Sequence, residues 1–326
     1  MFVFTRRQTL STSLAATLAL GLAAATPALA QVTEIRVDYA TYNPLSLVIK
    51  EQKLLEKEFA ADKIGVRWVL SAGSNKALEF LNAGSLDIGS TAGAAALVAR
   101  INGNPIKTVG VFSRPEWTAL VVGKDSKITK VEELKGQKIA VTRGTDPHIF
   151  LVRALDKAGL TEKDVKLVLL QHADGKTALV RGDVDAWAGL DPMMAQAEIE
   201  DGSKLLYRQA EDNTWGVLDA REEFAAKNPE LVKRVLKVYE QARVWAASNQ
   251  DTLRKALVAE TKLPDVVIAR QLERTDLTNA AITPATTQTI LEAGLALQKA
   301  GVVKADVDVK AVTTALIDTS FAPAGK

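Results

Sequence analysis

The sequence predicts an α/β protein made of two similar lobes, and three observations lead to this fold class. Short β-rich runs alternate with helical runs after Gln31, a pattern typical of largely parallel sheets covered by helices. The same motifs return in the same order about a hundred residues further along the chain. Two turn-rich segments, Ser113–Trp117 and Asp212–Gly216, flank the second set of motifs, so we expect the chain to cross between the lobes there.

The composition supports a folded protein and excludes several kinds of site. The chain has 326 residues, of which 47% are hydrophobic and 25% charged, and this length favours two domains. It has no cysteine, which excludes disulfides, thiolate zinc sites, iron–sulfur clusters and cysteine nucleophiles. Only two histidines are present, too few for a histidine-rich metal site, and a formal charge of +2 argues against nucleic-acid binding. We expect no metal, no cofactor and no nucleic-acid partner.

Residues 1–30 have the three parts of a secretory signal peptide. Two arginines precede an uncharged apolar run over 14–25, and small residues before Gln31 suit cleavage after Ala30. The run is shorter than the about 20 apolar residues that a membrane span needs, and the alternative is a core helix. The arginine pair resembles the twin-arginine export motif, although Thr9 stands where that motif usually has Phe, so the export route stays open. Either route predicts a periplasmic protein.

The two arginines of this segment account for the net charge. Without them, 39 of the 41 basic residues remain against 39 acidic residues, so the mature chain would be neutral. A neutral protein has no bulk field that gathers anions, so selectivity for an anion would come from local dipoles and hydroxyls.

The first lobe is expected to alternate three strands with two helices. Asn43 and Pro44 supply an N-cap and a first-turn proline for a helix whose apolar face runs from Leu45 to Phe59. The third strand continues into a run of small residues at 89–94. The other expected elements are the strand Ile35–Tyr39, the strand Val66–Leu70, the helix Ser74–Asn82 and the strand Leu86–Ile88.

The second lobe repeats this plan at nearly constant offsets. Pro147 follows Pro44 by 103 positions, and the Gly-x-x-Asp string at 84–87 returns at 182–185 after 98 positions. Near-equal offsets in one order predict duplicated lobes, and chance matching of short strings is the alternative. The expected elements are the strand Lys138–Thr142, the helix Ile149–Lys157 and, in a helical tail, Glu223–Ala247, Leu253–Thr261, Asp265–Leu272 and Pro284–Lys299.

Strand-to-helix turns of the first lobe are the candidates for anion binding. Gly73–Asn75 and Ser90–Gly93 would each present backbone N–H groups and side-chain donors at a helix N-terminus, which favours an anion. The alternative is that the serines only cap helices and the glycines only permit close packing.

The turn over 143–148 in the second lobe predicts a different contact. A capping Asp146 already places a negative charge at that helix end, so the first lobe would hold the anion and the second would meet the ligand's tail. Asp146 or His148 would bond an amine or hydroxyl on the tail, unless Asp146 is a cap only. Trp187 would pack on apolar ligand carbons, and core packing is its alternative role.

Several segments together resemble a known family. They are Ala72-Gly73, Leu81–Thr91, Val141–His148 and Val184–Pro192. With them the chain resembles the periplasmic aliphatic-sulfonate-binding proteins of ABC importers, within the wider nitrate, sulfonate and taurine substrate-binding family. The resemblance implies the two-lobed periplasmic-binding-protein fold of type II, with two crossovers and a mixed sheet flanked by helices in each lobe. The implied boundaries are a signal peptide at 1–30, lobe 1 at 31–116 and 219–326, and lobe 2 at 117–218.

The resemblance also implies a function. We expect a monomeric solute-binding protein that closes on an organosulfonate and delivers it to an ABC permease in the inner membrane. We expect no enzymatic activity. The ligand-facing residues expected from the turns and the resemblance are Thr41, Tyr42, Asn43, Gly73, Ser74, Asn75, Ser90, Thr91, Ala92, Thr142, Gly144, Thr145, Asp146, His148, Trp187 and Asp191.

Departures from the family pattern fall in these turns. Members that bind alkanesulfonates often carry Gln and a basic residue where this chain has 40–43, and a serine-rich turn where it has Thr145-Asp146-Pro147. A larger or amine-bearing sulfonate therefore belongs among the expected ligands.

Two other functions remain as alternatives. One is a binder of taurine, nitrate or another small organic anion that acts in sensing. The other is an extracytoplasmic enzyme, for which the sequence offers neither a Gly-x-Ser-x-Gly nucleophile elbow nor histidines at metal-ligand spacing. The thiamine-precursor synthases that share the fold are disfavoured because their cysteine-rich motif is absent.

Overall fold

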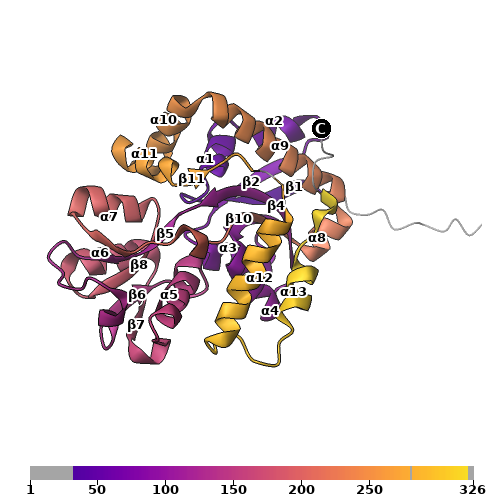
Figure 1. Cartoon of the computed structure of the whole chain (residues 1–326). Coiled ribbons are helices and arrows are strands. Elements are labelled where there is room, and N and C mark those ends of the chain that lie inside the picture. The colour runs from indigo at the N-terminus through magenta and orange to yellow at the C-terminus, as the bar shows by residue number, and fades with distance from the viewer. Residues whose placement is uncertain (1–31, 280, 322–326) are drawn as a thin grey trace, which may run out of the picture. The chain divides into compact units, whose positions relative to one another are not determined.

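The structure, a computed structural model, describes residues 32–279 and 281–321. Within Thr33–Lys326 it shows two mixed β-sheets flanked by helices (Figure 1), which confirms the α/β class and the two lobes. The expected signal peptide lies outside the described residues. Among the described residues, no helix combines the length and apolar character needed to cross a membrane.

The first sheet has six strands in the order β11-β4-β10-β3-β1-β2. β1 pairs in parallel with both β2 and β3, whereas β10 lies antiparallel between β3 and β4. The strands are β1 (Glu34–Tyr39), β2 (Gly65–Leu70), β3 (Ile88–Ala92), β4 (Ile106–Pro115), β10 (Gly216–Arg221) and β11 (Thr275–Asp276).

The second sheet has five strands in the order β7-β6-β8-β5-β9. β6 pairs in parallel with β7 and β8, and β5 lies antiparallel between β8 and β9, so this sheet repeats the order and directions of β2-β1-β3-β10-β4. The duplication predicted from the offsets is thus present in the fold. The strands are β5 (Thr118–Val122), β6 (Lys138–Val141), β7 (Lys166–Leu169), β8 (Ala186–Leu190) and β9 (Lys204–Tyr207).

Two connections join the sheets, at the places predicted from turn residues. The first is Glu116-Trp117, between β4 and β5, and the second runs from the end of β9 to Gly216. The strand after each connection enters the middle of the other sheet. Residues 216–218, which the expected boundary assigns to lobe 2, pair with β3 and β4 of the first sheet.

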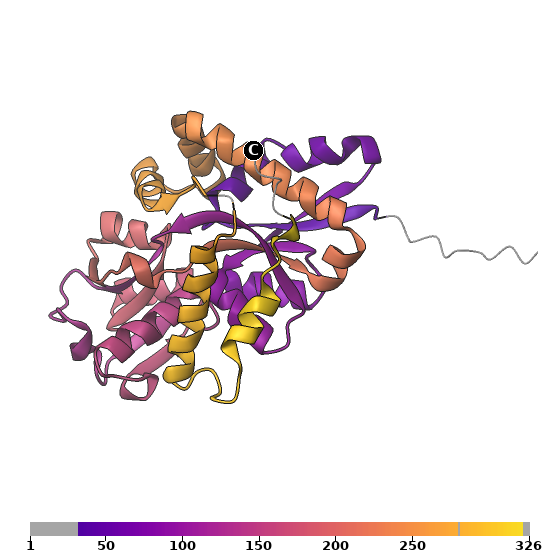
Figure 2. The same ribbon diagram turned by 45° about the vertical axis from the view of Figure 1, so that its right-hand side comes forward.

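Helices cover both sheets, and the C-terminal ones return to the first lobe (Figures 1 and 2). There α9 and α10 contact α1, while α12 and α13 contact α4. Lobe 1 carries α1 (Pro44–Glu51), α2 (Leu54–Phe59), α3 (Ser74–Asn82), α4 (Gly93–Ile101), α8 (Glu222–Lys227), α9 (Pro229–Ser248), α10 (Gln250–Thr261), α11 (Asp265–Glu273), α12 (Pro284–Lys299) and α13 (Val309–Leu316), and lobe 2 carries α5 (Asp146–Lys157), α6 (His172–Arg181) and α7 (Met193–Asp201).

Two expected helices are interrupted in the structure. The helix expected from Pro44 to Phe59 divides at Lys53, whose φ of 53° is left-handed. The helix expected over 223–247 divides at Asn228, because a proline at 229 disfavours the helical conformation of the preceding residue. α13 and the two-residue strand β11 were not predicted, and neither were several elements between the predicted ones, such as β4, α4 and α7.

The small-residue run at 89–94 is a strand rather than a turn. β3 extends to Ala92, and α4 begins at Gly93. A Cβ on Gly89 would lie 3.3 Å from Leu81 Cδ1, so small residues let α3 pack closely on this central strand. Small residues that suggest a flexible turn in the sequence therefore permit close packing against the buried strand β3.

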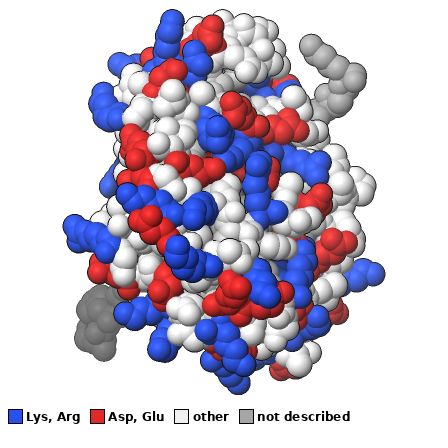
Figure 3. Space-filling view, turned by 60° about the vertical axis from the view of Figure 1, so that its left-hand side comes forward, with Lys and Arg blue, Asp and Glu red and all other residues white. Residues whose placement is uncertain are grey.

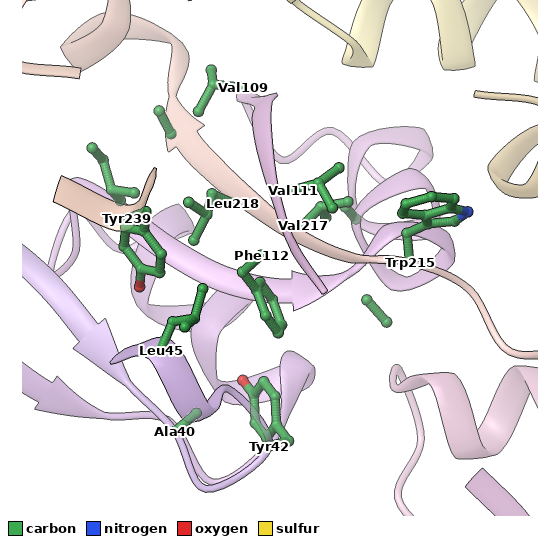
Figure 4. Packing of buried hydrophobic residues seen from close by; sticks show 14 of the residues in the cluster. Ala40, Tyr42, Leu45, Val109, Val111, Phe112, Trp215, Val217, Leu218 and Tyr239 are labelled. Atoms are coloured by element: carbon green, nitrogen blue, oxygen red, sulfur yellow. The ribbon is translucent and has the colours of Figure 1, made fainter. Parts of the chain in front are cut away.

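The largest apolar cluster spans both lobes. It is built on the first sheet but includes Ile149 and Val152 of α5. Figure 4 shows Tyr42 and Phe112 within this cluster, and Trp117 of the first connection meets the Tyr42 ring edge-on, with centroids 5.9 Å apart. Apolar contact thus holds the lobes together beside the connections.

On the surface, basic and acidic side chains are interspersed across the face shown in Figure 3.

Candidate functional site

Two helix N-termini, one from each lobe, meet at Gly73. This glycine is the buried N-cap of α3. A Cβ placed on it would lie 2.9 Å from Nε2 of His172, the first residue of α6, and 2.8 Å from Asn75 Oδ1. Because the first N–H groups of a helix have no intrahelical partner, both helix ends bring amide donors to this place.

The turn between β6 and α5 completes the meeting point from the second lobe. A Cβ on Gly144 would lie 3.7 Å from the Asn75 Cβ, and Gly144 has a φ of +78°, which favours glycine. Thr145 is the N-cap of α5 and donates its hydroxyl to the Thr142 carbonyl at 2.6 Å, which holds the turn. Four predicted residues, Gly73, Asn75, Thr142 and Gly144, are therefore gathered around His172.

Two buried polar atoms at this meeting point have no hydrogen-bond partner among the described residues. They are Asn75 Oδ1 and His172 Nε2. His172 is fully buried, and burial lowers the pKa of its imidazole to about 3, so the ring is neutral at pH 7. Since buried polar groups in proteins are normally satisfied, this pair indicates a place for a ligand group or a water molecule.

Ser74 ties this region to the first sheet. Its hydroxyl oxygen accepts a hydrogen bond from the Ala92 N–H at 3.0 Å, where β3 gives way to α4. The two turns that the sequence predicts as anion sites are therefore joined by a hydrogen bond within lobe 1.

Ser90 and Thr91 do not lie at a turn, as the sequence predicts, but inside β3. The Ser90 hydroxyl lies 3.0 Å from each carboxylate oxygen of Asp38, and the Thr91 hydroxyl donates to Asp219 at 2.5 Å. Both hydroxyls are fully buried. Burial disfavours the charged form of both carboxyls and raises the pKa of Asp38 and of Asp219 to about 7.

The predicted turn at 41–43 is likewise engaged within the first lobe. The Thr41 carbonyl accepts from the Gln271 side chain at 2.7 Å, and the Tyr42 hydroxyl donates to the Ser90 carbonyl at 2.9 Å. Asn43 is the N-cap of α1, as expected, because its side chain accepts from the Ser46 N–H at 3.2 Å.

Asp146 is not the N-cap that the sequence predicts. Thr145 holds that position, and Asp146 is the first residue of α5. Its carboxylate accepts from the Trp117 indole at 2.8 Å, from the Thr214 N–H at 3.0 Å and from the Thr214 hydroxyl at 2.7 Å. The side chain therefore binds both inter-lobe connections rather than an open turn.

The three remaining predicted residues are also buried, although the Trp187 indole nitrogen has no hydrogen-bond partner among the described residues. His148 Nε2 lies 2.8 Å from a carboxylate oxygen of Glu162, a contact that lowers the pKa of that glutamate. Trp187 is fully buried on β8, and a Cβ on Gly175 of α6 would lie 2.7 Å from its indole nitrogen. Asp191 faces Arg274 across the lobes, with their closest atoms 3.4 Å apart.

Arg274 was not singled out in the sequence. It is buried at the end of α11, in lobe 1, and also forms a 2.6 Å ion pair with Glu198 of α7, in lobe 2. No pattern in the sequence signals this pair, because its partners are far apart along the chain.

His172 could have been found from the repeat. It follows Gly73 by 99 positions, within the range of the other offsets, so it opens the helix of lobe 2 that corresponds to α3. Across the described ranges, no group of three or more His, Cys, Asp or Glu side chains is placed to hold a metal ion.

Comparisons with known proteins agree with this architecture. A sequence model of the NMT1/THI5-like family matches residues 59–253. A protein of Escherichia coli K12, provisionally named an aliphatic sulfonates-binding protein, is 33% identical over 242 residues, covering 73% of this chain and 75% of the relative. The taurine-binding periplasmic protein of the same strain is 30% identical over 231 residues, covering 68% and 69%.

Solved structures share the fold. The alkanesulfonate-binding protein of Xanthomonas axonopodis pv. citri, bound to MOPS, superposes with a TM-score of 0.81 at 24% identity, covering 88% of this chain and 99% of that one. The periplasmic aliphatic sulphonate binding protein of E. coli gives 0.72 at 28% identity, covering 85% and 91%. A desulfurization enzyme also has this fold, with a TM-score of 0.63 at 14% identity. From the residues that the family model matches and the identity to these relatives, the chain belongs to the NMT1/THI5-like family.

Proposed function

We propose that this protein is the extracytoplasmic solute-binding protein of an ABC importer and that it binds an organosulfonate between its lobes. The observation that carries the proposal is the meeting of two helix N-termini at Gly73, with Asn75 Oδ1 and His172 Nε2 left unsatisfied beside them. Its relatives' names support the ligand class, since they refer to aliphatic sulfonates and taurine.

The sulfonate oxygens would be held by backbone amides. The first turns of α3 and α6 supply these donors, and each helix end favours an anion by about 0.3–1 kcal/mol, or up to roughly 2 kcal/mol when partly buried. Each hydrogen bond to a charged group adds about 1.5–3 kcal/mol. Four or five such bonds, after association costs, approach the about −8 kcal/mol that micromolar binding needs. This scheme requires no lysine or arginine, in keeping with the neutral mature chain.

A specific set of predicted residues is assigned to the ligand in this proposal. Lobe 1 contributes Gly73–Asn75, and lobe 2 contributes Thr142, Gly144 and, in addition, His172. The other predicted residues make contacts within the protein and are not assigned to the ligand. They are Thr41, Tyr42, Asn43, Ser90, Thr91, Ala92, Thr145, Asp146, His148, Trp187 and Asp191.

Binding to the protein spanning residues 31–326 tests the proposal. Thermal unfolding is followed with ethanesulfonate, taurine, MOPS, nitrate and sulfate. A specific sulfonate at 100 times its dissociation constant should add about 2.7 kcal/mol to the free energy of unfolding. Stabilisation by sulfate or nitrate alone would replace the sulfonate with an inorganic ligand, and stabilisation by none would refute the proposal.

We also infer that the protein binds without turnover. Mass spectrometry of a sulfonate recovered after long incubation should return it unchanged, whereas release of sulfite or another product would establish an enzyme.

Mass spectrometry of the protein itself tests export and cleavage. The periplasmic product should begin at Gln31, and a mass that retains residues 1–30 would contradict cleavage after Ala30.

A further inference from the structure

The hydrogen bonds around His172 define which of its ring nitrogens carries the proton. Its Nδ1 lies 3.2 Å from the Thr142 hydroxyl oxygen, and that hydroxyl lies 2.7 Å from the Leu170 carbonyl oxygen. A carbonyl oxygen can only accept, so the single hydroxyl proton of Thr142 is donated to Leu170. The same oxygen therefore accepts from His172, which places the proton on Nδ1.

The other ring nitrogen is consequently an acceptor. In a neutral imidazole with its proton on Nδ1, Nε2 carries a lone pair. The ring is neutral because it is fully buried, and no charged side chain contributes to its titration. Nε2 thus requires a hydrogen-bond donor, and among the described residues it has none.

A second acceptor lies in the same place and comes from the other lobe. Asn75 Oδ1 is also buried without a partner, and both atoms are within 3 Å of a Cβ placed on Gly73. A sulfonate oxygen has no proton to donate, so it cannot satisfy either atom. The amide N–H groups of the neighbouring helix ends suit the anion, whereas these two acceptors suit an N–H or O–H group.

We propose that Asn75 Oδ1 and His172 Nε2 together accept hydrogen bonds from a hydroxyl or ammonium group of the ligand. The preferred ligands are then short sulfonates that carry such a group near the sulfur, rather than plain alkanesulfonates. This inference rests on the proposed function. The sequence suggested that Asp146 or His148 would bond an amine or hydroxyl on the ligand's tail, but in the structure their side chains bond Trp117 and Glu162. We assign this contact to His172 and Asn75 instead.

Two ligands of nearly equal size test the proposal. 2-Hydroxyethanesulfonate and propane-1-sulfonate differ by a hydroxyl in place of a methyl group, and their affinities are measured by titration calorimetry at pH 7.5. The hydroxyl compound should bind at least about ten-fold more tightly, because the site's acceptors stay unpaired with the alkyl compound. Equal affinities, or tighter binding of propane-1-sulfonate, would overturn the inference while leaving the proposed function intact. No binding of either would also overturn the inference, whereas the proposed function fails only if no sulfonate in the thermal-unfolding series stabilises the protein.

Substitutions then locate the preference. His172→Phe keeps a ring but removes the acceptor, and Asn75→Ala removes the second acceptor from the other lobe, so each should reduce the affinity ratio toward one. Thr177→Val, on the exposed face of α6, is the matched control and should keep the ratio of the unchanged protein. A ratio that survives both acceptor substitutions would contradict the assignment. Asn75→Ala keeps the test valid even where His172→Phe fails to fold.

The protonation state gives an independent readout. If neutral His172 accepts from the ligand, binding heats measured in buffers of different ionisation enthalpy should show no proton uptake. Uptake of about one proton per ligand that disappears in His172→Phe would mean that the imidazole becomes charged and donates to the sulfonate instead. That outcome would overturn the inference.

Discussion

The Asp146 carboxylate accepts a 2.8 Å hydrogen bond from the Trp117 indole, and through Thr214 it also holds the second connection between the lobes. A single side chain of α5 thus restrains both segments about which the lobes would rotate. Asp146, Trp117 and Thr214 are all buried, so water cannot readily replace a hydrogen bond that is lost between them.

Removing this carboxylate should destabilise the protein strongly. Asp146→Ala leaves the Trp117 indole and two Thr214 donors without their acceptor, and at about 1–3 kcal/mol per unsatisfied buried group we expect a loss of at least about 3 kcal/mol. Asp146→Asn retains an oxygen for Trp117 and the Thr214 N–H and can donate to the Thr214 hydroxyl, so it should lose much less. Urea unfolding of both variants measures this difference, and equal losses would show that charge rather than bonding matters.

The buried carboxyls of Asp38 and Asp219 predict a pH dependence of stability. Each has a pKa of about 7 in the folded protein and near 4 in the unfolded chain, so the folded state binds more protons between these values. The free energy of unfolding should therefore fall as pH rises from about 4 to 7 and then level off. Asp219→Asn should flatten this slope in urea unfolding at pH 5 and pH 8, whereas Asp306→Asn, at an exposed position, should leave it unchanged.

Arg274 links the lobes on the side of α7. Its guanidinium is buried between Asp191 and Glu198, so Arg274→Ala leaves these carboxylates without their cation and should cost about 3–5 kcal/mol of unfolding free energy. The neighbouring Arg270 is partly exposed and lies 3.8 Å from Glu198, so Arg270→Ala should cost less than about 1 kcal/mol. Comparable losses in the two variants would mean that Arg274 is not the main contact.

Gly73→Ala tests the meeting of the two helix N-termini. The added Cβ would fall within 3 Å of Asn75 Oδ1 and His172 Nε2, but the φ of Gly73 is 171°, an extended value open to any residue. The substitution should therefore obstruct closure while leaving the backbone of lobe 1 unstrained, and sulfonate affinity should fall at least about ten-fold. Gly123→Ala, where a Cβ meets no atom within 4 Å, should leave affinity unchanged. A Gly73→Ala protein with full affinity would place the ligand elsewhere.

The sequence predicts the repeated elements better than the site. Strand and helix periodicity, the prolines at 44 and 147 and the offsets between motifs suffice for the two lobes and for helices such as α3 and α12, whose bounds match the expected ones. The site depends on which partner each polar side chain finds across the fold. Ser90 and Thr91 look like ligand donors in the sequence because their acceptors, Asp38 and Asp219, lie 52 and 128 residues away along the chain.

The arrangement of β5 and β10 limits how this protein can move. Each begins within two residues of a connection and is hydrogen-bonded on both sides in the middle of a sheet, so little backbone is free to absorb torsion. Two connections, Glu116-Trp117 and residues 208–215, that are anchored in this way favour rotation about the line that joins them over free twisting of the lobes. Helices α7 and α11, which contact each other across the lobes, would then change their spacing in only one way as the lobes rotate.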